Sequence, residues 1–179
     1  MNVLLHACCA PCSVACIEAL RQEGHALSVY WYNPNIHPFT EYKARRNALR
    51  DYAKQLELPM MEADEYGLRR FIAAVHPDYD ARCGYCYTVR LEEAARQAAD
   101  NGFDAFTTSL LISPYQNHEL LIETGKAMGE KYGVRFLDRD FRPLFREGQA
   151  AAREMGLYMQ KYCGCIFSEE ERYQKKKRA

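Results

Sequence analysis

The fold is decided by residues 2–20, which read NVLLHACCAPCSVACIEAL. Residues 2–6 form a short apolar run that predicts a buried strand. Pro11 follows, a residue type that is common at the first positions of helices, and apolar residues then recur at helical spacing. This stretch therefore predicts a strand that passes directly into a helix, with Cys8 and Cys9 at the junction.

Strands and helices alternate along the rest of the chain. Apolar segments rich in β-forming residues predict strands over residues 26–32, 59–63, 103–111 and 134–137. Amphipathic segments predict helices over residues 40–57, 68–75, 119–131 and 144–157, one between Cys86 and Gly102, and one after Cys165. A chain of 179 residues suits one domain. We predict a single α/β domain over residues 1–179, a mostly parallel five-stranded sheet with helices on both faces, and a basic tail at about residues 174–179.

The composition indicates a globular protein of the cell interior. Hydrophobic residues make up 48% of the chain and charged residues 27%, which allows a core of normal size. No apolar run approaches the ~20 residues of a membrane helix, and residues 1–6 lack the features of a signal peptide. We expect a cytoplasmic protein without a membrane partner. The formal net charge is zero, so only a local group of basic residues can indicate a nucleic-acid partner.

Residues with functional side chains follow four of the predicted strands. In a parallel α/β sheet, ligands bind beyond the carboxyl ends of the strands. Those ends are followed by Cys8 and Cys9, by Asn33-Pro34-Asn35, by Asp64 and by residues 109–117. All four segments should lie along one edge of the sheet, and we predict that this edge holds the active site.

The eight cysteines fall into groups. They are Cys8, Cys9, Cys12 and Cys16, then Cys83 and Cys86, then Cys163 and Cys165. In a reducing compartment, such grouping indicates metal binding or redox chemistry rather than a disulfide framework. Cys8 and Cys9 stand at a helix N-terminus, where the helix dipole favours a thiolate or an anionic cluster. Cys9-x-x-Cys12 also resembles a thioredoxin-like redox motif, and Cys12 and Cys16 are alternatively core residues.

The second group is Cys83-Gly84-Tyr85-Cys86. Two residues between thiolates allow both to reach one metal ion or one cluster. Structural zinc sites usually join two such pairs about 12–20 residues apart. Whole secondary-structure elements separate Cys12 from Cys83, so we favour an iron–sulfur cluster over zinc at the predicted edge.

The third group, Cys163-Gly164-Cys165, has a single residue between its thiols. A disulfide across so small a ring is strained, and strained disulfides tend to be labile or catalytic. We interpret this pair as a redox-active dithiol; a third metal-binding pair is the alternative.

Five short motifs stand out along the chain. They are HACCAPC at residues 6–12, YNPNI at 32–36, RCGYCY at 82–87, TTSLLISP at 107–114 and YCGC at 162–165. Together they resemble the QueH family of epoxyqueuosine reductases, over residues 4 to about 168. The resemblance implies an adenine-nucleotide α-hydrolase-like fold. Cysteines stand where the glycine-rich ATP phosphate loop of such folds would be, which argues against the use of ATP.

The same resemblance implies a reaction and its machinery. The reaction is reduction of epoxyqueuosine to queuosine in the tRNA anticodon loop, the last step of queuosine biosynthesis, with electrons from a donor that the sequence does not identify. The implied ligands of a [4Fe-4S] cluster are Cys8, Cys9, Cys83 and Cys86, and the implied redox-active pair is Cys163 and Cys165. The family is also associated with a second, mononuclear iron, for which Asp64 is a candidate ligand on position alone. Met159 stands where the family pattern leads us to expect a basic residue, which puts one anionic contact in doubt.

Other residues of the predicted edge are candidates for contact with substrate. Candidate binding residues are Asn33, Asn35, Ser109 and Tyr115, and candidate proton donors are His6, His118 and Tyr115. Basic residues that could hold phosphates are Lys43, Arg45, Arg46 and Arg50 in one predicted helix, and Lys175, Lys176, Lys177 and Arg178 in the tail. Tyrosine and phenylalanine side chains near this edge could stack on an unpaired base.

Three other functions remain compatible with the residues alone. A thiol–disulfide oxidoreductase needs only one C-x-x-C motif. A zinc-bound RNA-binding module would hold zinc and lack redox activity. A nucleotide-dependent tRNA-modifying transferase would require ATP.

Overall fold

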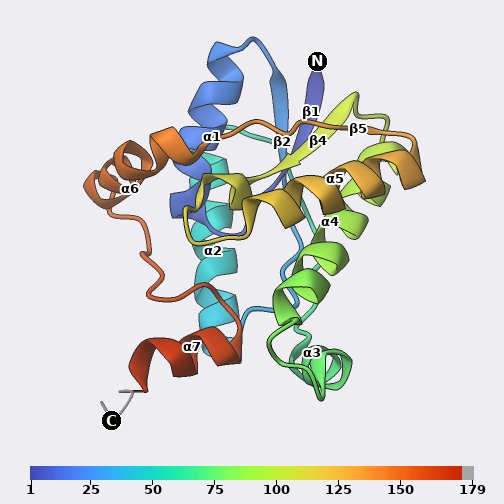
Figure 1. Ribbon diagram of the computed structural model, residues 1–179. Coiled ribbons are helices and arrows are strands. Elements are labelled where there is room, and N and C mark those ends of the chain that lie inside the picture. Colours follow the sequence, from blue (N-terminus) through green and yellow to red (C-terminus); the bar gives the residue numbers. More distant parts are fainter. Residues whose placement is uncertain (175–179) are drawn as a thin grey trace.

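The computed structural model describes residues 1–174 and contains a five-stranded parallel sheet (Figure 1). The strands are β1 (Asn2–His6), β2 (Ala26–Trp31), β3 (Met60–Glu62), β4 (Ala105–Thr108) and β5 (Arg135–Phe136). They lie in the order β3-β2-β1-β4-β5, and every neighbouring pair is parallel. The five predicted strands and their parallel arrangement are therefore confirmed.

β1 occupies the centre of the sheet because it is apolar on both faces. Val3, Leu4 and Leu5 are each 0% exposed, as expected for a parallel strand that helices cover on both sides. Leu5 lies opposite Val29 of β2 and Thr107 of β4. The chain builds the sheet outward from β1 in one direction through β3 and then in the other through β5. The direction reverses between β1 and β4, and α/β proteins bind ligands in the crevice at such a reversal.

The helices form two layers around the sheet. In one layer α1 (Ala10–Gln22) packs against α2 (Phe39–Gln55) and α6 (Phe145–Glu154), and in the other α4 (Arg82–Asp100) packs against α5 (His118–Tyr132) (Figure 1). Right-handed crossovers account for this division, because the connections on the two sides of β1 run in opposite directions. Two further helices, α3 (Leu68–Val75) and α7 (Ile166–Tyr173), lie at the end of the molecule away from the sheet (Figure 1).

Two element boundaries differ from those that the sequence predicted. β4 ends at Thr108 rather than at residue 111, because the chain enters a 3₁₀ turn, η1 (Ser109–Ile112), whose Leu110 amide donates to the Thr108 hydroxyl at 3.2 Å. Residues 83–86 lie inside the first turns of α4 rather than before it. The Ala81 amide donates to the Asp78 carboxylate at 3.3 Å, in the turn that leads into this helix.

The C-terminal segment returns across the molecule. A 3₁₀ turn, η2 (Arg142–Leu144), leads into α6, and the chain then runs back past the start of α2 to α7 (Figure 1). Tyr158 and Tyr162 of this segment hydrogen-bond to Glu41 of α2 and to the His37 carbonyl. The predicted basic residues 175–178 lie outside the described residues. Among the residues that are described, no helix has the length and apolar character to cross a membrane.

Candidate active site

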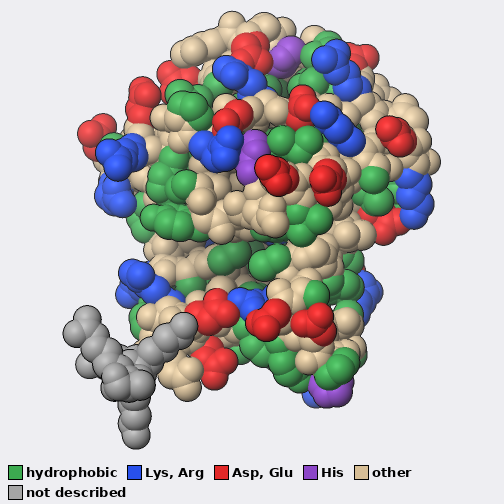
Figure 2. All heavy atoms as spheres, in the orientation of Figure 1, with side chains coloured by type: hydrophobic (Ala, Val, Ile, Leu, Met, Phe, Trp, Pro, Cys, Tyr) green, Lys and Arg blue, Asp and Glu red, His purple; other side chains and the backbone are tan. Residues whose placement is uncertain are grey.

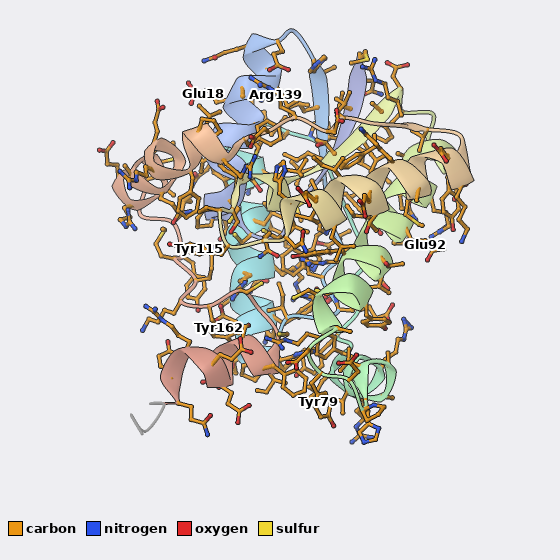
Figure 3. All side chains as sticks on the ribbon, in the orientation of Figure 1. Glu18, Tyr79, Glu92, Tyr115, Arg139 and Tyr162 are labelled. Atoms are coloured by element: carbon orange, nitrogen blue, oxygen red, sulfur yellow. The ribbon has the colours of Figure 1, made fainter. Side chains whose placement is uncertain are left out.

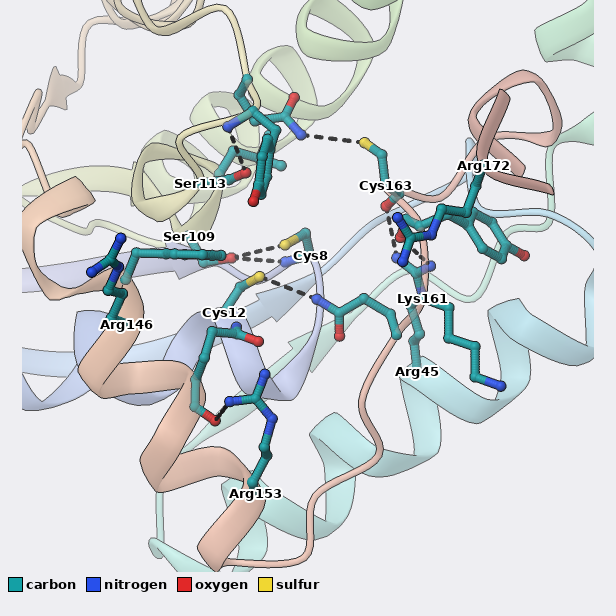
Figure 4. A pocket seen from close by; sticks show the side chains of 17 residues that line it. Cys8, Cys12, Arg45, Ser109, Ser113, Arg146, Arg153, Lys161, Cys163 and Arg172 are labelled. Atoms are coloured by element: carbon teal, nitrogen blue, oxygen red, sulfur yellow. Dashed lines mark hydrogen bonds between the residues drawn. The ribbon is translucent and has the colours of Figure 1, made fainter. Parts of the chain in front are cut away.

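A cavity of about 660 Å³ opens where the order of the strands reverses (Figure 4). Its walls come from the segment after β1, from η1 after β4, from α6, and from the segment that connects α6 to α7. The side chains that line it include those of Cys8, Cys12, Ser109, Gln116, Gln160 and Cys163. The predicted active-site edge of the sheet therefore does carry a cavity, and thiols from two distant parts of the chain face it.

Cys8, Cys9 and Cys12 form a compact group at the N-terminus of α1. Their sulfur atoms all lie within 4.8 Å of one another, and the Cys8 and Cys9 sulfurs are 3.8 Å apart. The Cys9 side chain accepts from the Cys12 amide at 3.4 Å and so caps the helix. At the start of η1, the Ser109 hydroxyl accepts from the Cys8 amide at 3.0 Å and donates to the Cys8 sulfur at 3.3 Å. Ser109, a candidate on this edge, is thus a direct partner of Cys8.

The three thiols do not titrate alike. Hydrogen bonds from the Cys12 and Cys9 thiols hold the pKa of Cys8 well below its usual range. Burial raises the pKa of the Cys9 thiol, and hydrogen bonding to Cys8 raises that of Cys12. The group therefore favours one thiolate, and further thiolates require a cation in place of their protons.

Arg90 of α4 carries a buried positive charge beside Cys86. The side chain is 2% exposed; its Nη2 donates to the Cys86 sulfur and its Nε to the Cys86 carbonyl, both at 3.0 Å. No carboxylate among the described residues forms an ion pair with it. Burial lowers the pKa of Arg90, but the thiolate forms of Cys86, Cys163 and Cys8 raise it above its usual value. A buried guanidinium is costly without an anion, so Arg90 favours a thiolate or another negatively charged group beside it.

Cys83 and Cys86 are not part of the compact group that Cys8, Cys9 and Cys12 form, and they do not line the cavity. Cys83 is exposed, whereas Cys86 is buried with Phe71, Val75 and Cys165. Burial raises the pKa of Cys86 to about 12, so the free side chain is a neutral thiol. The electrostatic neighbours of Cys83 include Cys163 and Cys165. Arg90 thus interacts electrostatically with members of all three cysteine groups, namely Cys8, Cys83, Cys86 and Cys163.

Hydrogen bonds from other parts of the chain hold the Cys163-Gly164-Cys165 segment in place. Buried Arg45 donates from Nη1 to the Cys163 carbonyl at 2.7 Å and from Nη2 to the Tyr162 carbonyl at 2.9 Å. The His37 amide donates to the Gly164 carbonyl at 2.8 Å. Gly164 has a φ of +155°, and a Cβ on it would come within 3.2 Å of the Ile36 side chain. A side chain at this position would be strained by the positive φ and would crowd the loop after β2.

The two thiols of this segment differ in exposure. Cys163 is exposed to the cavity, and the Gln116 side chain donates to its sulfur at 3.2 Å (Figure 4). Cys165 is buried and caps α7, accepting from the Ser168 amide at 3.4 Å. Cys163 is therefore the member of the pair that a ligand in the cavity would meet first.

The role of Arg45 leads to a prediction on stability. Arg45→Met leaves two carbonyl oxygens without their donor and the Glu41 carboxylate, 11% exposed, without its ion pair at 2.7 Å. Removing one partner from a buried ion pair costs about 3–5 kcal/mol. We expect the free energy of unfolding to fall by about that amount in urea titrations followed by circular dichroism.

A matched control lies in the same helix. Arg50 pairs with Glu62 at the surface, where its side chain is 41% exposed, and such pairs contribute about 0–1 kcal/mol. Arg50→Met should therefore leave the unfolding midpoint almost unchanged. Equal losses in the two variants would show that Arg45 does not hold the C-terminal segment.

The remaining predicted residues have other surroundings. Asp64 lies outside the cavity lining and is bound by the Tyr42 hydroxyl and by Arg46. Asn33 and Asn35 are buried, and the Asn33 amide donates to the Ala7 carbonyl at 2.9 Å. Tyr115, 85% exposed, lines the cavity. Of the candidates for substrate contact, the geometry thus favours Ser109 and Tyr115, and the roles of the others stay predictions.

The three candidate proton donors also differ in whether they reach the cavity. His6 is buried between the Thr108 hydroxyl and the Tyr32 carbonyl, and burial lowers its pKa to about 4. It is therefore neutral at pH 7 and bonded on both nitrogens. His118 lies 3.6 Å from the Asp140 carboxylate, outside the cavity lining. Tyr115 is the candidate that reaches the cavity.

The structure corrects one part of the predicted phosphate-binding group in α2. Arg45 is 1% exposed and is used internally, so it is not free to meet a phosphate. Arg46 and Arg50 are paired with Asp64 and Glu62. Lys43 is exposed but does not line the cavity. Sequence spacing placed these residues in one helix but could not show which acids fold against them.

Three residues of the site carried no signal in the sequence. Arg90 donates to the Cys86 sulfur, and Gln116 donates to the Cys163 sulfur. Gln160 donates to the Cys12 sulfur at 3.3 Å, and its buried side-chain oxygen has no hydrogen-bond partner among the described residues. Arginine and glutamine are common helix and loop residues, so only their position in the fold reveals them.

Comparison with known protein families gives a match over most of the chain. The profile of the family described as epoxyqueuosine reductase QueH matches residues 3–171. Epoxyqueuosine reductase QueH of Dehalococcoides mccartyi is 37% identical over 174 residues, covering 97% of this chain and 96% of that protein. The protein of the same name from Thermotoga maritima is 37% identical over 183 residues, covering 97% and 93% respectively.

Solved structures of other proteins share the fold. The U34-tRNA thiolase NcsA of Methanococcus maripaludis, solved with its [4Fe-4S] cluster, superposes with a TM-score of 0.62 at 14% identity and covers 94% of this chain and 61% of that one. A predicted subunit of a tRNA methyltransferase from Methanocaldococcus jannaschii superposes with a TM-score of 0.57 at 10% identity and covers 86% and 76%. These likenesses confirm the expected adenine-nucleotide α-hydrolase-like fold.

Proposed function

The chain belongs to the epoxyqueuosine reductase QueH family, and we propose that it reduces epoxyqueuosine to queuosine in the tRNA anticodon loop, with the epoxide held in the cavity between Cys8 and Cys163. The family makes it an oxidoreductase. One observation supports this location. The thiols of residues 8–12 and of residue 163 line the same cavity, at the point where the strand order reverses.

Cys163 and Cys165 can supply the electrons and protons that the reaction consumes. Reduction breaks both C–O bonds of the epoxide, leaves an alkene and releases the oxygen as water, so it consumes two electrons and two protons. Oxidation of the Cys163 and Cys165 thiols to a disulfide releases two electrons and two protons. One dithiol therefore accounts for one turnover, and a cellular thiol reductant must then reduce the disulfide.

An iron–sulfur cluster fits the remaining cysteines. We assign its ligands as Cys8, Cys9, Cys83 and Cys86, in two pairs that each lie at the N-terminus of a helix. The fit rests on the donor set, on the burial of three of the four thiols, and on Arg90, whose buried charge needs an anion beside it. When bound, such a cluster supplies single electrons and an iron that can act as a Lewis acid.

The protein's own groups have distinct tasks in this proposal. Ser109 orients Cys8 through two hydrogen bonds, and Arg90 compensates negative charge at the centre of the site. Gln116 holds Cys163 toward the cavity through its amide. Tyr115 is the candidate to give a proton to the leaving oxygen, because it is the one predicted donor on the cavity wall.

The cavity contains a better candidate ligand than Asp64 for a second, mononuclear iron. Asp64 is bound by Arg46 and Tyr42 outside the cavity. Cys12 lies on the cavity wall within 4.8 Å of two proposed cluster ligands, beside the unpartnered side-chain oxygen of Gln160. We therefore propose Cys12 in place of Asp64 as the protein ligand of any such iron.

Anaerobic purification and assay test the function. We expect a brown protein with about four cluster irons and matching sulfide, which converts epoxyqueuosine in tRNA to queuosine when a reductant is supplied. Nucleoside analysis of the digested tRNA by mass spectrometry measures the product. Stoichiometric zinc with no conversion would favour a zinc-bound RNA-binding module. Disulfide reduction by a colourless, metal-free protein would favour a thiol–disulfide oxidoreductase.

A further inference from the structure

Four exposed cations surround the mouth of the cavity. They are Arg146 and Arg153 of α6, Lys161 of the following segment and Arg172 of α7, and all four line the cavity. None forms an ion pair with another described residue. Arg46, Arg50, Arg82, Arg96 and Arg142 elsewhere all pair with Asp or Glu. We call the first four the cationic rim.

The cationic rim has two sides. Arg146 and Arg153 lie on one side of Cys8 and Cys12, and Lys161 and Arg172 lie on the other (Figure 4). No Asp or Glu is among the described residues that line the cavity. Over the face seen in Figure 2, by contrast, acidic and basic side chains are interspersed. The chain has no net charge, so the positive character of the rim comes from placement rather than from composition.

Two kinds of contact are offered to a ligand at this mouth. Unpaired guanidinium and ammonium groups on opposite sides suit an extended polyanion that passes over the opening. Tyr115, 85% exposed, and Phe145 stand at the same mouth with ring centroids 6.0 Å apart, and Tyr162 comes from the segment that carries Lys161 (Figure 3). Exposed rings beside cations are the usual means of binding unpaired bases and their phosphates.

We propose that the cationic rim binds the phosphates on both sides of the target nucleotide of a single-stranded RNA loop, so that this one nucleotide enters the cavity. Arg146 and Arg153 bind the phosphates on one side, and Lys161 and Arg172 bind those on the other. The cavity, about 660 Å³, has the size of sites that enclose a small organic group. This inference rests on the proposed function for the identity of the RNA, but not for the binding itself.

The test measures RNA binding and turnover separately, with holoenzyme prepared anaerobically. The probe is a fluorescent anticodon stem–loop RNA, titrated by anisotropy over a series of salt concentrations. Each lost contact to a single strand should make the slope of log K against log salt less negative by about 0.7. We expect Arg146→Gln/Arg153→Gln and Lys161→Gln/Arg172→Gln each to reduce the slope by about 1.4 and to raise KM for RNA about tenfold or more, with kcat near the wild-type value.

The matched control is Lys54→Gln/Arg135→Gln, which also removes two exposed positive charges. Lys54 stands in the last turn of α2 and Arg135 at the start of β5, so both lie toward the amino ends of the strands, opposite the cavity. Unchanged affinity and salt slope in both rim variants, or an equal change in the control, would overturn the proposal. Tight binding of a peptide or of double-stranded DNA in place of the loop RNA, with the same dependence on the rim, would also overturn it.

The two proposals fail in different ways. If the wild-type protein binds the loop RNA through the rim but does not reduce the epoxide, the proposed function is wrong and the rim inference stands. If it reduces the epoxide while the rim variants bind and turn over normally, the function stands and the rim inference is wrong.

Discussion

Replacing any one of Cys8, Cys9, Cys83 or Cys86 with Ala should remove the iron–sulfur cluster and abolish epoxide reduction. We expect the iron content to fall from about four to less than one per chain, and turnover to fall by roughly a thousandfold or more. Changes that only touch a ligand's neighbours typically cost about 10–100-fold, so a larger loss identifies the ligands themselves.

The expected loss follows from the way the two pairs are built. Cys8 and Cys9 directly precede α1, and Cys83 and Cys86 lie in the first turns of α4, so each pair stands where a helix favours anions. Burial keeps Cys86 a neutral thiol in the absence of metal, and its ionisation depends on the cluster iron. Losing one ligand therefore also leaves Arg90 beside an uncompensated site, which further weakens the binding of the remaining three.

Two other cysteines of α1 make the test specific. Cys16 is 0% exposed and its thiol donates to the Cys12 carbonyl at 3.3 Å, so Cys16→Ala should leave iron and sulfide at wild-type levels. Cys12→Ala should also retain the four cluster irons, although Cys12 lies close to Cys8 and Cys9. Full occupancy in Cys83→Ala together with loss in Cys12→Ala would transfer the site to the first three cysteines and contradict our assignment.

The sequence predicts the sheet well because each strand has a local signal. Residues 2–6 are apolar on both faces, which is the pattern of a central parallel strand, and the structure places them there. Pro11 predicts the start of α1, and Gly133, which ends α5 with a φ of +68°, predicts its end. The edge that collects the carboxyl ends of the strands then follows from topology alone. The cavity lies at that edge.

The contacts within the site could not be predicted in the same way, since they join residues far apart in the sequence. Ser109 bonds to Cys8 across 101 positions, and Arg45 bonds to Cys163 across 118. Arg45 had the sequence pattern of a phosphate-binding residue, yet the fold uses it internally. The opposite holds for α6, where Arg146 and Arg153 resemble ordinary surface residues and yet line the cavity. The type of a side chain shows which chemistry it can perform, but only the fold shows which side chains lie together.

Replacing Cys163 or Cys165 with Ser should abolish multiple turnover while the cluster stays in place. The thiols supply the two electrons and two protons that the reaction consumes, and a Ser hydroxyl cannot be oxidised to a disulfide. We expect a loss of at least about a hundredfold in kcat, with iron, sulfide and the visible absorption spectrum unchanged. Loss of the cluster in either variant would mean that this pair supplies ligands instead.

A double variant separates a redox pair from two independent contributors. Residues that act as one unit are not additive, so Cys163→Ser/Cys165→Ser should be no slower than either single variant. Wild-type protein oxidised by substrate should lose two titratable thiols per chain, and the single variants should lose none. Cys163 faces the cavity, whereas Cys165 is buried. Alkylation of the reduced wild-type protein should therefore modify Cys163 first, and the modified Cys163 can no longer form a disulfide with Cys165. Normal thiol loss in Cys163→Ser would show that the electrons come from another pair, for which Cys9 and Cys12, with their thioredoxin-like spacing, would be the first to test.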